Sequence, residues 1–396
     1  MLTYEGLGSD ADKDAVHIAT RSLDKGVFPG AFCFVSPDIA GDDEYCYLKH
    51  SDGAGSKVNV AYMAVKEGIC PVDVWKWIAQ DSLVMNIDDM AAVGAVDGFK
   101  LTNCIDRNPL VIGDEVVAKI IEGYVDVISR FSKWSKIEMC GGETADTGNN
   151  VRTLVVNSDV SVRMKRRDVI DASNTGPGDV LIGFASYGRS SYEHFYNSGI
   201  SSNGFTLLTH AMLNGVYKRK YPETFDPNIF ESAYSGKFTL DSLVPGLNVT
   251  LAEAMLSPTR SYLPLVKKLL EDGGRGIKGI FNCTGGGLTK PIRFGRDVKY
   301  VFDDMLGPGH FFTHIIESAN ISGRELYRTF NMGCRLVVSC SPEVVDSVIR
   351  VASGFDIEAK VVGRVENSSR PGFNQVEVLD PVSRDVFYYE KQYVKN

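Results

Sequence analysis

A nine-residue stretch of turn-forming residues, DASNTGPGD at Asp171–Asp179, divides the chain of 396 residues into two parts. Clusters of Gly, Pro, Asn, Asp and Ser are typical of loops between folded segments. The apolar segment Val180–Ser186, which follows at once, is typical of a strand. Strand and helix patterns alternate on both sides of the stretch, which indicates the α/β (α+β) class. We therefore predict two domains, residues 1–170 and residues 171–396.

Two segments have the apolar spacing of helices. They are Glu115–Phe131, which is clearly amphipathic, and residues 72–95. A further helix is predicted to start at Ser257–Pro258, because serine followed by proline is a helix start signal. Residues 218–250 show little periodicity, and we expect an irregular excursion there.

Charge and cysteine usage exclude several classes of function. The formal net charge is -8, which does not favour nucleic-acid binding. No apolar run approaches the roughly 20 residues that span a membrane, and the first residues lack the pattern of a signal peptide. We therefore expect a cytoplasmic protein. None of the eight cysteines forms a CxxC pair, so reduced thiols are expected rather than a zinc site.

Two motifs in the first half combine acids with glycine or lysine. In DGAGSK, Gly53 and Gly55 allow the backbone to approach phosphate oxygens, and Lys57 adds a positive charge. A plain turn explains that motif alone equally well, and the spacing is not that of a Walker A loop. In MNIDDMAAVGA, Asp88 and Asp89 are adjacent inside an apolar helix, which suits Mg²⁺ bound with a nucleotide. The alternative is a helix end that faces solvent.

Three further motifs are rich in glycine. CGGETAD follows a predicted strand and suits a metal or phosphate site, or else a turn with a surface Glu143. NCTGGGLTKP holds three consecutive glycines, which suit either close approach of the backbone to a ligand or a flexible linker. The SSNG stretch that begins at Ser201 resembles a helix N-terminus, where amides bind anions. Together the motifs favour neutralisation of phosphate charge over acyl transfer.

The order of the motifs from Ser51 to Val338 resembles that of the phosphoribosylformylglycinamidine cyclo-ligases, also called aminoimidazole ribonucleotide synthetases. DGAGSK, the helical acid pair, GGETA, SNG, SPTRSY and TGGGL occur here in the order of that family, with the features of a divergent branch. The resemblance implies a PurM-like two-domain subunit. Its N-terminal half would form a dimeric, β-barrel-like core, and its C-terminal half would be mixed α/β.

The resemblance also implies an activity and its site residues. The expected reaction is ATP-dependent ring closure of formylglycinamidine ribonucleotide in purine biosynthesis, with Mg²⁺ required and K⁺ helping, in a homodimer. The implied metal ligands are Asp52, Asp88, Asp89 and Glu143. The implied ATP and phosphate ligands are Gly53, Gly55, Lys57, Gly141, Gly142 and Thr144. The implied substrate contacts are Ser202, Asn203, Gly204, Thr284, Gly285, Gly286 and Gly287. The implied catalytic residues are Lys57, Asp88 and Asn282.

One departure from the family pattern concerns a residue implied as catalytic, and two other functions stay open. Asn282 stands where many family members have a histidine, and an asparagine side chain cannot shuttle a proton. His50 is a candidate neighbour, although a lone histidine is more often structural. The alternatives are another ATP-dependent enzyme of the superfamily, of the thiamine-phosphate kinase or selenophosphate synthetase type, or a non-catalytic nucleotide-binding subunit. The first cysteine is Cys33, which speaks against the selenium enzyme.

Overall fold

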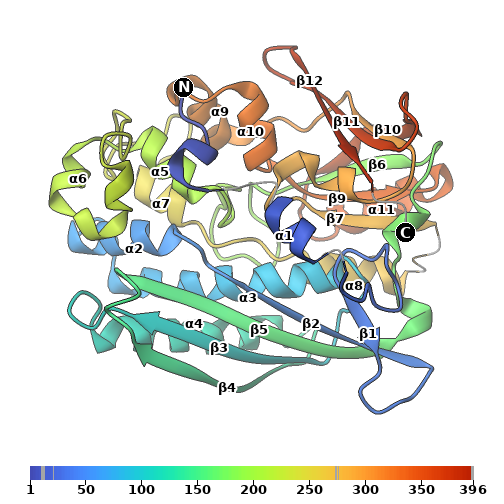
Figure 1. Ribbon diagram of the computed structural model, residues 1–396, viewed down its shortest axis with the longest axis horizontal. Coiled ribbons are helices and arrows are strands. Elements are labelled where there is room, and N and C mark those ends of the chain that lie inside the picture. The colour runs from blue at the N-terminus through green and yellow to red at the C-terminus, as the bar shows by residue number, and fades with distance from the viewer. Residues whose placement is uncertain (10–13, 21, 273, 275, 394–396) are drawn as a thin grey trace.

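A computed structural model describes the chain except residues 10–13, 21, 273, 275 and 394–396. The N-terminal half forms a five-stranded sheet in the order β1-β2-β5-β3-β4 (Figure 1). Neighbouring strands are antiparallel except for the parallel pair β3 and β4. The strand bounds are Val35–Pro37 (β1), Tyr45–Gly53 (β2), Phe99–Arg107 (β3), Ile137–Asp146 (β4) and Leu154–Lys165 (β5).

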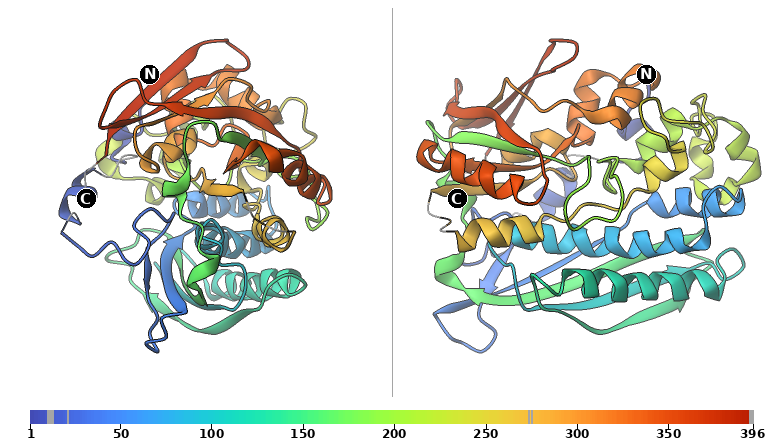
Figure 2. Two further views of the ribbon diagram at one scale, coloured as in Figure 1. Left: turned by 90° about the vertical axis from the view of Figure 1, so that its right-hand side faces the viewer. Right: turned by 180° about the vertical axis from the view of Figure 1, so that it is seen from behind.

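One face of this sheet is covered by helices. Buried and less buried positions alternate along β5, as a strand with one covered face requires. Helices α3 and α4 lie on the covered face, and α3 runs between this sheet and the C-terminal half (Figures 1 and 2). The helix bounds in this half are Asp14–Ala19 (α1), Lys57–Lys66 (α2), Trp75–Ala91 (α3) and Asp114–Phe131 (α4). Within one chain the sheet is open, and the expected barrel-like closure stays a prediction.

The C-terminal half is built on a seven-stranded sheet in the order β12-β11-β8-β10-β6-β9-β7. Neighbouring strands are antiparallel except for the parallel pair β11 and β8. The strand bounds are Val180–Ala185 (β6), Ile277–Asn282 (β7), Val298–Phe302 (β8), Cys334–Cys340 (β9), Ala359–Asn367 (β10), Phe373–Leu379 (β11) and Val386–Gln392 (β12). The helix bounds are Phe205–Met212 (α5), Val216–Lys220 (α6), Leu251–Leu256 (α7), Leu263–Glu271 (α8), Gly309–Ser318 (α9), Gly323–Thr329 (α10) and Val345–Ser353 (α11).

The mixed α/β class is confirmed, and so is the irregular excursion. Between α6 and α7 the described chain forms turns and two short 3₁₀ helices, Pro222–Thr224 and Pro227–Ile229. The two sheets draw their strands from opposite sides of Asp171–Asp179, but one continuous apolar core joins both halves. The division into two domains therefore stays a prediction. No helix in the described part of the chain has the length and apolar character that crossing a membrane needs.

The predicted helix start at Ser257–Pro258 is wrong. Helix α8 begins at Leu263, and residues 257–262 run as an extended segment between α7 and α8. The reason is that this segment provides backbone and hydroxyl groups to buried charges on α2 and α3, as Ser257, Thr259 and Ser261 do. A helix over the same residues would use those backbone groups internally.

Candidate functional site

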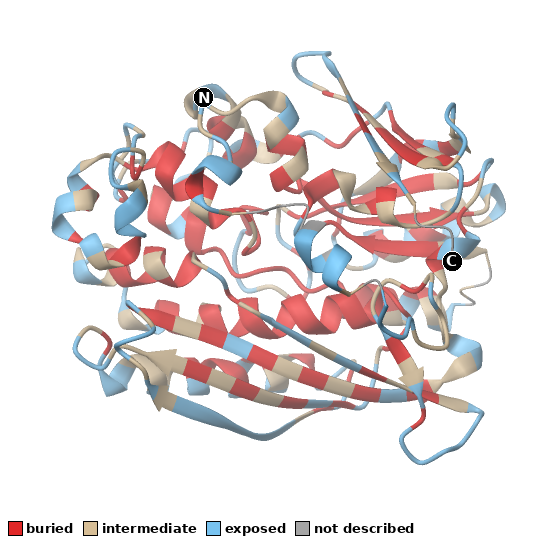
Figure 3. Cartoon of the chain, in the orientation of Figure 1, coloured by how far each residue is buried: buried red, intermediate tan, exposed pale blue. Residues whose placement is uncertain are grey.

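Helix α3 carries the polar groups that join the two halves of the molecule. The helix is buried on nearly all sides (Figure 3), and it includes the buried carboxylates Asp81, Asp88 and Asp89. Asp81 and Asp88 are seven residues apart and therefore lie on the same side of the helix. Buried charges must be paired or hydrogen-bonded, and each of these three acids finds partners in the C-terminal half. The alternative that the acid pair marks a solvent-facing helix end is wrong.

The first of these acids holds the lysine of DGAGSK. The Nζ atom of Lys57 lies 3.0 Å from Oδ1 of Asp81, 3.2 Å from the carbonyl oxygen of Ser201 and 2.6 Å from that of Ser257. Oδ1 of Asp81 also accepts hydrogen bonds from the backbone and the hydroxyl group of Thr259. Burial lowers the pKa of Lys57, and the charge of Asp81 opposes this shift. An ammonium group has three N–H donors, so internal acceptors account for all of them in this structure.

Asp88 is similarly enclosed. Its side chain is 1% exposed, and Oδ2 lies 2.6 Å from Nη2 of Arg335. Oδ1 accepts a hydrogen bond of 2.6 Å from the hydroxyl of Ser261, and the backbone N–H of Tyr262 bonds to the same carboxylate. Both oxygens implied as metal ligands therefore face protein donors here. The arrangement ties α3 to β9, which carries Arg335, and to the segment before α8.

Asp89 has a different setting, because it faces the junction between the halves. Its side chain is 11% exposed; Oδ1 accepts a hydrogen bond of 2.7 Å from Asn282, and Oδ2 lies 3.5 Å from Nε2 of His50. Asn282 is itself buried at the end of β7, and its Oδ1 accepts from Arg335 at 2.9 Å. Asn282 thus links Asp89 to the Arg335–Asp88 pair.

The charge of Asp89 also interacts with that of Lys290. Burial lowers the pKa of Lys290, and the negative charges of Asp89 and Asp52 oppose the shift. The charges of both predicted acids therefore act on the Lys290 ammonium group. Asp52 and Gly53 are the last residues of β2, and α2 begins at Lys57, so the DGAGSK motif connects a strand to a helix.

The glycine-rich motifs of the two halves meet beside this region. A Cβ atom on Gly55 would lie 3.6 Å from the carbonyl oxygen of Ser202, and one on Gly285 would lie 3.8 Å from Nδ2 of Asn203. Oδ1 of Asn203 is buried without a hydrogen-bond partner among the described residues. An unsatisfied buried acceptor of this kind is a group that a ligand donor can complete.

Local backbone geometry explains one of the glycines and one helix start. Gly287 has a positive φ, and a Cβ atom there would collide with the carbonyl oxygens of Tyr327 and Phe330. The TGGG motif that includes Thr284 and Gly286 is therefore packed against the C-terminal end of α10 and is not a flexible linker. Helix α5 begins directly after Gly204, which confirms that the SNG motif precedes a helix N-terminus.

The GGETA motif lies elsewhere. It was expected at a strand end, but β4 continues through it to Asp146. Strand β4 is the outer strand of its sheet, on the far side from β2 (Figure 1), and the residues from Met139 to Thr144 are exposed. Gly141, Gly142, Glu143 and Thr144 thus face solvent. In the described part of the chain no group of three His, Cys, Asp or Glu side chains could hold a metal, so one chain does not gather the four implied metal ligands.

Sequence reasoning missed Asp81 and Arg335, which are central to this network. Arg335 lies inside the stretch that resembles the family, but a single arginine in an apolar strand gave no separate signal. Asp81 could have been found from its spacing to Asp88, because two acids seven residues apart share one helix side. Lys290, three residues after the glycine run, could have been included in that motif as a cation near phosphate.

Comparison with known proteins places most of the chain in one family. The model of the AIR synthase related protein N-terminal domain matches residues 31–161, and that of the C-terminal domain matches residues 176–374. A phosphoribosylformylglycinamidine cyclo-ligase of Methanococcus maripaludis is 27% identical over 386 residues, which cover 94% of each chain. The enzyme of the same name from Thermoplasma volcanium is 28% identical over 321 residues, which cover 81% of this chain and 80% of that one.

Solved structures agree in fold. Phosphoribosylformylglycinamidine synthase II from Thermotoga maritima superposes with a TM-score of 0.53 at 13% identity; the match covers 96% of this chain but only 48% of that longer chain. A chain of the HypE–HypF complex gives a TM-score of 0.53 at 12% identity, with 96% of this chain and 100% of that chain covered. These likenesses confirm the PurM-like two-domain fold. The C-terminal family model alone spans half of the sequence, and the chain belongs to the family of AIR synthase related proteins.

Proposed function

We propose that this protein closes the imidazole ring of aminoimidazole ribonucleotide, from formylglycinamidine ribonucleotide and ATP, with release of ADP and phosphate in purine biosynthesis. The relatives named above carry the name of this activity. The single observation that supports it most is the meeting of Gly55, Ser202, Asn203 and Gly285 from both halves, beside Asp89. A reaction between two phosphate-bearing substrates needs such a junction, because both must be held at once.

The chemistry asks mainly for positioning. An amide oxygen is a poor leaving group, so ATP first phosphorylates it to give an iminophosphate and ADP. The substrate's own amine nitrogen then attacks the activated carbon, and phosphate leaves as the ring closes. Backbone amides at Gly53, Gly55 and the run Gly285–Gly287 would face the phosphates, since close approach of backbone to phosphate needs residues without Cβ. Charge stabilisation by the chain carries most of the catalytic effect in phosphoryl transfer.

The buried network has a positioning role in this proposal. Asn282 uses its amide to donate to Asp89 and its oxygen to accept from Arg335, so it orients the Asp89 carboxylate. It does not replace a histidine as a proton carrier. Lys57 and Asp88 act in the same indirect way, because their charged atoms bond to protein groups on all sides. Asp89 is the member of the helical pair that is left facing the junction.

The donor set also suits Mg²⁺ bound together with a nucleotide. This ion is commonly held by one or two carboxylates, with substrate phosphates and water as the remaining ligands. Asp89 and Asp52 would provide those carboxylates: Oδ2 of Asp89 lies 3.5 Å from Nε2 of His50, and Asp52 follows His50 by two residues on the same face of β2. Bound Mg²⁺ would neutralise phosphate charge during transfer. The K⁺ dependence is a prediction from the family resemblance alone.

We further propose that the protein acts as a homodimer through β4. The outer strand of a sheet has unpaired backbone groups, and proteins usually cover such a strand. Here the residues from Met139 to Thr144 are exposed in an outer strand that includes glycine and apolar residues. Pairing with a second copy would cover them. It would also bring the GGETA motif, with Glu143, to the neighbouring subunit's site.

The test is a coupled assay with the purified protein. Formylglycinamidine ribonucleotide, ATP, Mg²⁺ and K⁺ are supplied, and aminoimidazole ribonucleotide and ADP are followed in parallel. We expect equal amounts of the two products, each dependent on the presence of both substrates. Asp89→Asn keeps the hydrogen bond from Asn282 but removes the charge, and it should abolish turnover. Asp272→Asn, in an exposed ion pair with Lys268, is the matched control and should leave turnover unchanged.

Two results would contradict the proposal. ATP hydrolysis or phosphorylation of another acceptor without ring closure would indicate a kinase-like member of the superfamily. ATP binding without any turnover would indicate a non-catalytic nucleotide-binding subunit, as the replacement of histidine by Asn282 could allow.

A further inference from the structure

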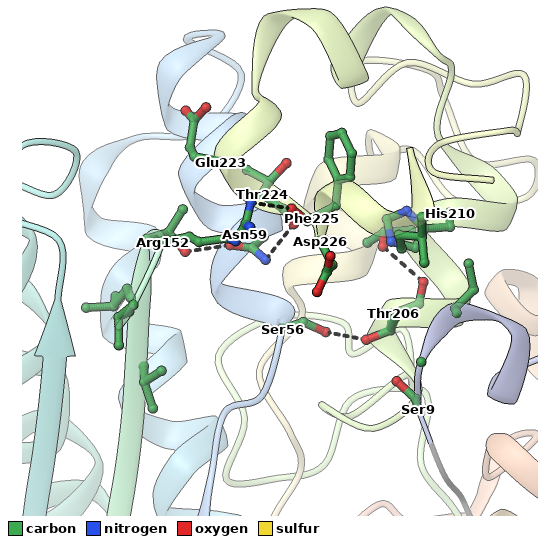
Figure 4. Close-up of a pocket in the computed structure, with 18 of the residues that line it drawn as sticks. Ser9, Ser56, Asn59, Arg152, Thr206, His210, Glu223, Thr224, Phe225 and Asp226 are labelled. Carbon is green, nitrogen blue, oxygen red and sulfur yellow. Dashed lines mark hydrogen bonds between the residues drawn. The ribbon is translucent and has the colours of Figure 1, made fainter. Parts of the chain in front are cut away.

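A polar pocket opens next to the glycine loops. It has a volume of about 660 Å³ (Figure 4), within the range of roughly 300–1,000 Å³ that is typical of small-molecule sites. Its walls come from the N-terminal residues 7–9, the start of α2, the turn before β5 and the first residues of that strand, helix α5 and the excursion after α6. The lining residues that matter here are Ser56, Asn59, Arg152, Thr206, His210 and Asp226.

The pocket borders the loops of the proposed site, because Ser56, within the DGAGSK motif, and Thr206, close after the SNG motif, line it. Ser56 lies between Gly55 and Lys57, and its hydroxyl is 3.2 Å from that of Thr206. Thr206 follows the SNG motif by two residues and lies in the first turn of α5. The two hydroxyls therefore form a contact between the loops of the two halves at the point where the pocket begins. A molecule held at the junction could extend into it.

Two lining residues, Asn59 and Glu223, form hydrogen bonds within the protein and belong to a fixed wall. The amide of Asn59 donates to the carbonyl oxygen of Thr224 at 3.0 Å, and its oxygen accepts from Thr153 at 2.7 Å. Glu223 accepts a hydrogen bond of 2.6 Å from the hydroxyl of Tyr62, and its side chain points away from the middle of the pocket (Figure 4). These contacts connect the excursion to α2, so the pocket has a formed shape without a ligand.

Other groups keep hydrogen-bonding capacity. The side chain of His210 is buried, with 3% of the residue exposed, and Nδ1 accepts from the backbone N–H of Tyr234 at 3.2 Å. The proton of the neutral ring is therefore on Nε2, and this donor has no protein partner among the described residues. Asp226 uses Oδ1 for the backbone N–H of Asn228, and its carboxylate lies among the labelled polar side chains in Figure 4.

The charges in the pocket suit a sugar phosphate. Arg152 is the one Lys or Arg side chain among the described lining residues, and its Nη1 is held by the carbonyl oxygen of Phe225 at 3.0 Å. A carboxylate is a common acceptor for ribose hydroxyls, a neutral imidazole N–H is a donor for sugar oxygens, and arginine suits phosphate. The pocket offers one of each.

We propose that this pocket binds the ribose 5-phosphate part of the ribonucleotide substrate, with Asp226 accepting from the ribose hydroxyls, His210 donating to a sugar oxygen and Arg152 contacting the phosphate. This inference rests on the proposed function for the identity of the ribonucleotide. The formylglycinamidine end of the substrate then lies toward Asp89. The excursion of residues 215–250 provides one wall of the substrate site and is not a surface decoration.

Calorimetric titration of the full-length protein with ribose 5-phosphate, without ATP, tests the proposal directly. Asp226→Asn should weaken binding by about tenfold or more, because it removes a charge-assisted hydrogen bond. Asparagine still caps the short helix at Pro227–Ile229, so the fold is kept. Glu231→Gln, an exposed acid in the same excursion that does not line the pocket, is the control and should bind as the wild type does.

A second ligand and a second variant keep the test sharp. 2-Deoxyribose 5-phosphate should bind the wild type more weakly than ribose 5-phosphate does, and this difference should disappear in Asp226→Asn. Arg152→Met should weaken binding of ribose 5-phosphate but not that of ribose. Equal binding of ribose 5-phosphate by wild type and Asp226→Asn, or no binding by the wild type at millimolar concentration, would overturn the assignment of the pocket.

The two proposals fail separately. Ring closure without measurable sugar-phosphate binding would remove the pocket from the substrate site and leave the proposed function intact. Sugar-phosphate binding that follows the variants as expected, without ring closure, would remove the proposed function and leave a sugar-phosphate site in the pocket.

Discussion

Helix α3 and strand β4 carry the two acidic motifs of the N-terminal half, and their environments are opposite. Asp88 on α3 has 1% of its side chain exposed and bonds to Arg335, Ser261 and Tyr262. Glu143 on β4 lies in an exposed stretch of an outer strand, where its Oε1 accepts from the backbone N–H of Thr144. An acidic residue is therefore buried and paired in one region and exposed to solvent in the other.

The difference shows that an acidic residue in a motif typical of ligand binding can instead stabilise the fold through hydrogen bonds and ion pairs. A carboxylate whose oxygens all accept hydrogen bonds from the protein has few lone pairs left to bind a metal. An exposed carboxylate can bind a metal with both oxygens and contributes little to stability. Asp89 lies between these extremes, since it is held by Asn282 on one side and faces His50 and the junction on the other. Substitutions at the three kinds of position should therefore change stability and turnover to different extents.

The largest effect is expected at Lys57. Removing one partner of a buried ion pair leaves the other charge unpaired, so Lys57→Met should lower the free energy of unfolding by about 3–5 kcal/mol. Urea unfolding measures this, with Lys268→Met, in an exposed pair with Asp272, as a control that should change little. If Lys57→Met unfolds like the wild type and instead raises only the KM for ATP, Lys57 is a phosphate ligand, as its motif suggested.

A smaller effect is expected for Asp88→Asn. The variant keeps the shape of the side chain but removes the charge opposite Arg335, which should cost about 1.5–3 kcal/mol of stability. Asp89→Asn, one residue along the helix, should cost less stability and far more turnover. Unfolding curves and the coupled assay on both variants measure the contrast. A stable Asp88→Asn with a raised Mg²⁺ requirement would instead place Asp88 among the metal ligands.

Burial should also affect how stability depends on pH. The buried His210, in the C-terminal half, is the residue that tests this. Burial lowers the pKa of His210 from 6.5 to about 4. Between these values the unfolded chain binds more protons than the folded one. The stability that the neutral ring contributes is thus complete above pH 6.5 and is lost as the pH falls toward 4. We expect a loss of about 1 kcal/mol between pH 7 and pH 5.5 from this group.

Urea unfolding at both pH values measures this contribution. His210→Gln should show a smaller loss than the wild type, because glutamine does not titrate and its oxygen can still accept from Tyr234. His194→Gln, at an exposed histidine, should show the wild-type dependence. An unchanged loss in His210→Gln would mean that other groups set the pH dependence.

The fold class and the neighbourhood of the motifs could be predicted from the sequence. The alternation of strand and helix patterns indicated the α/β class. The glycine motifs indicated loops where backbone can approach a ligand, and in the structure Gly55 and Gly285 lie beside the carbonyl oxygen of Ser202 and the side chain of Asn203. Local patterns carry this information because periodicity and turn residues depend on near neighbours along the chain.

Partners far apart in the sequence could not be predicted. Nothing near Asp88 indicates that Arg335, 247 residues away, neutralises it. Nothing near Lys57 indicates Asp81, Ser201 and Ser257. The helix predicted from Ser257 failed for the same reason, since tertiary hydrogen bonds to buried charges outweigh a local start signal. Whether an acidic residue is buried or exposed is set by tertiary packing. For that reason Asp88, Asp89 and Glu143 were all predicted as metal ligands, although their environments differ.

The smallest effect on stability is expected at Glu143, the exposed acid on the strand through which we propose that the protein dimerises. Glu143→Gln changes an exposed side chain and should alter the free energy of unfolding by less than about 0.5 kcal/mol. Turnover should nevertheless fall, because the carboxylate belongs to a site shared with a second copy. Glu115→Gln, at an exposed acid on α4, is the control and should leave both quantities unchanged.

Mixing two inactive variants tests whether the site is shared. In a two-fold dimer whose sites combine Asp89 of one copy with Glu143 of the other, a mixed dimer of Asp89→Asn and Glu143→Gln has one intact site. Random exchange of subunits makes half of the dimers mixed, so about a quarter of the wild-type activity should return. If both residues served the same chain's site, each site of the mixed dimer would keep one defect, and no activity would return. Recovery of activity would therefore show that the exposed acid of β4 and the partly buried acid of α3 act together across the dimer.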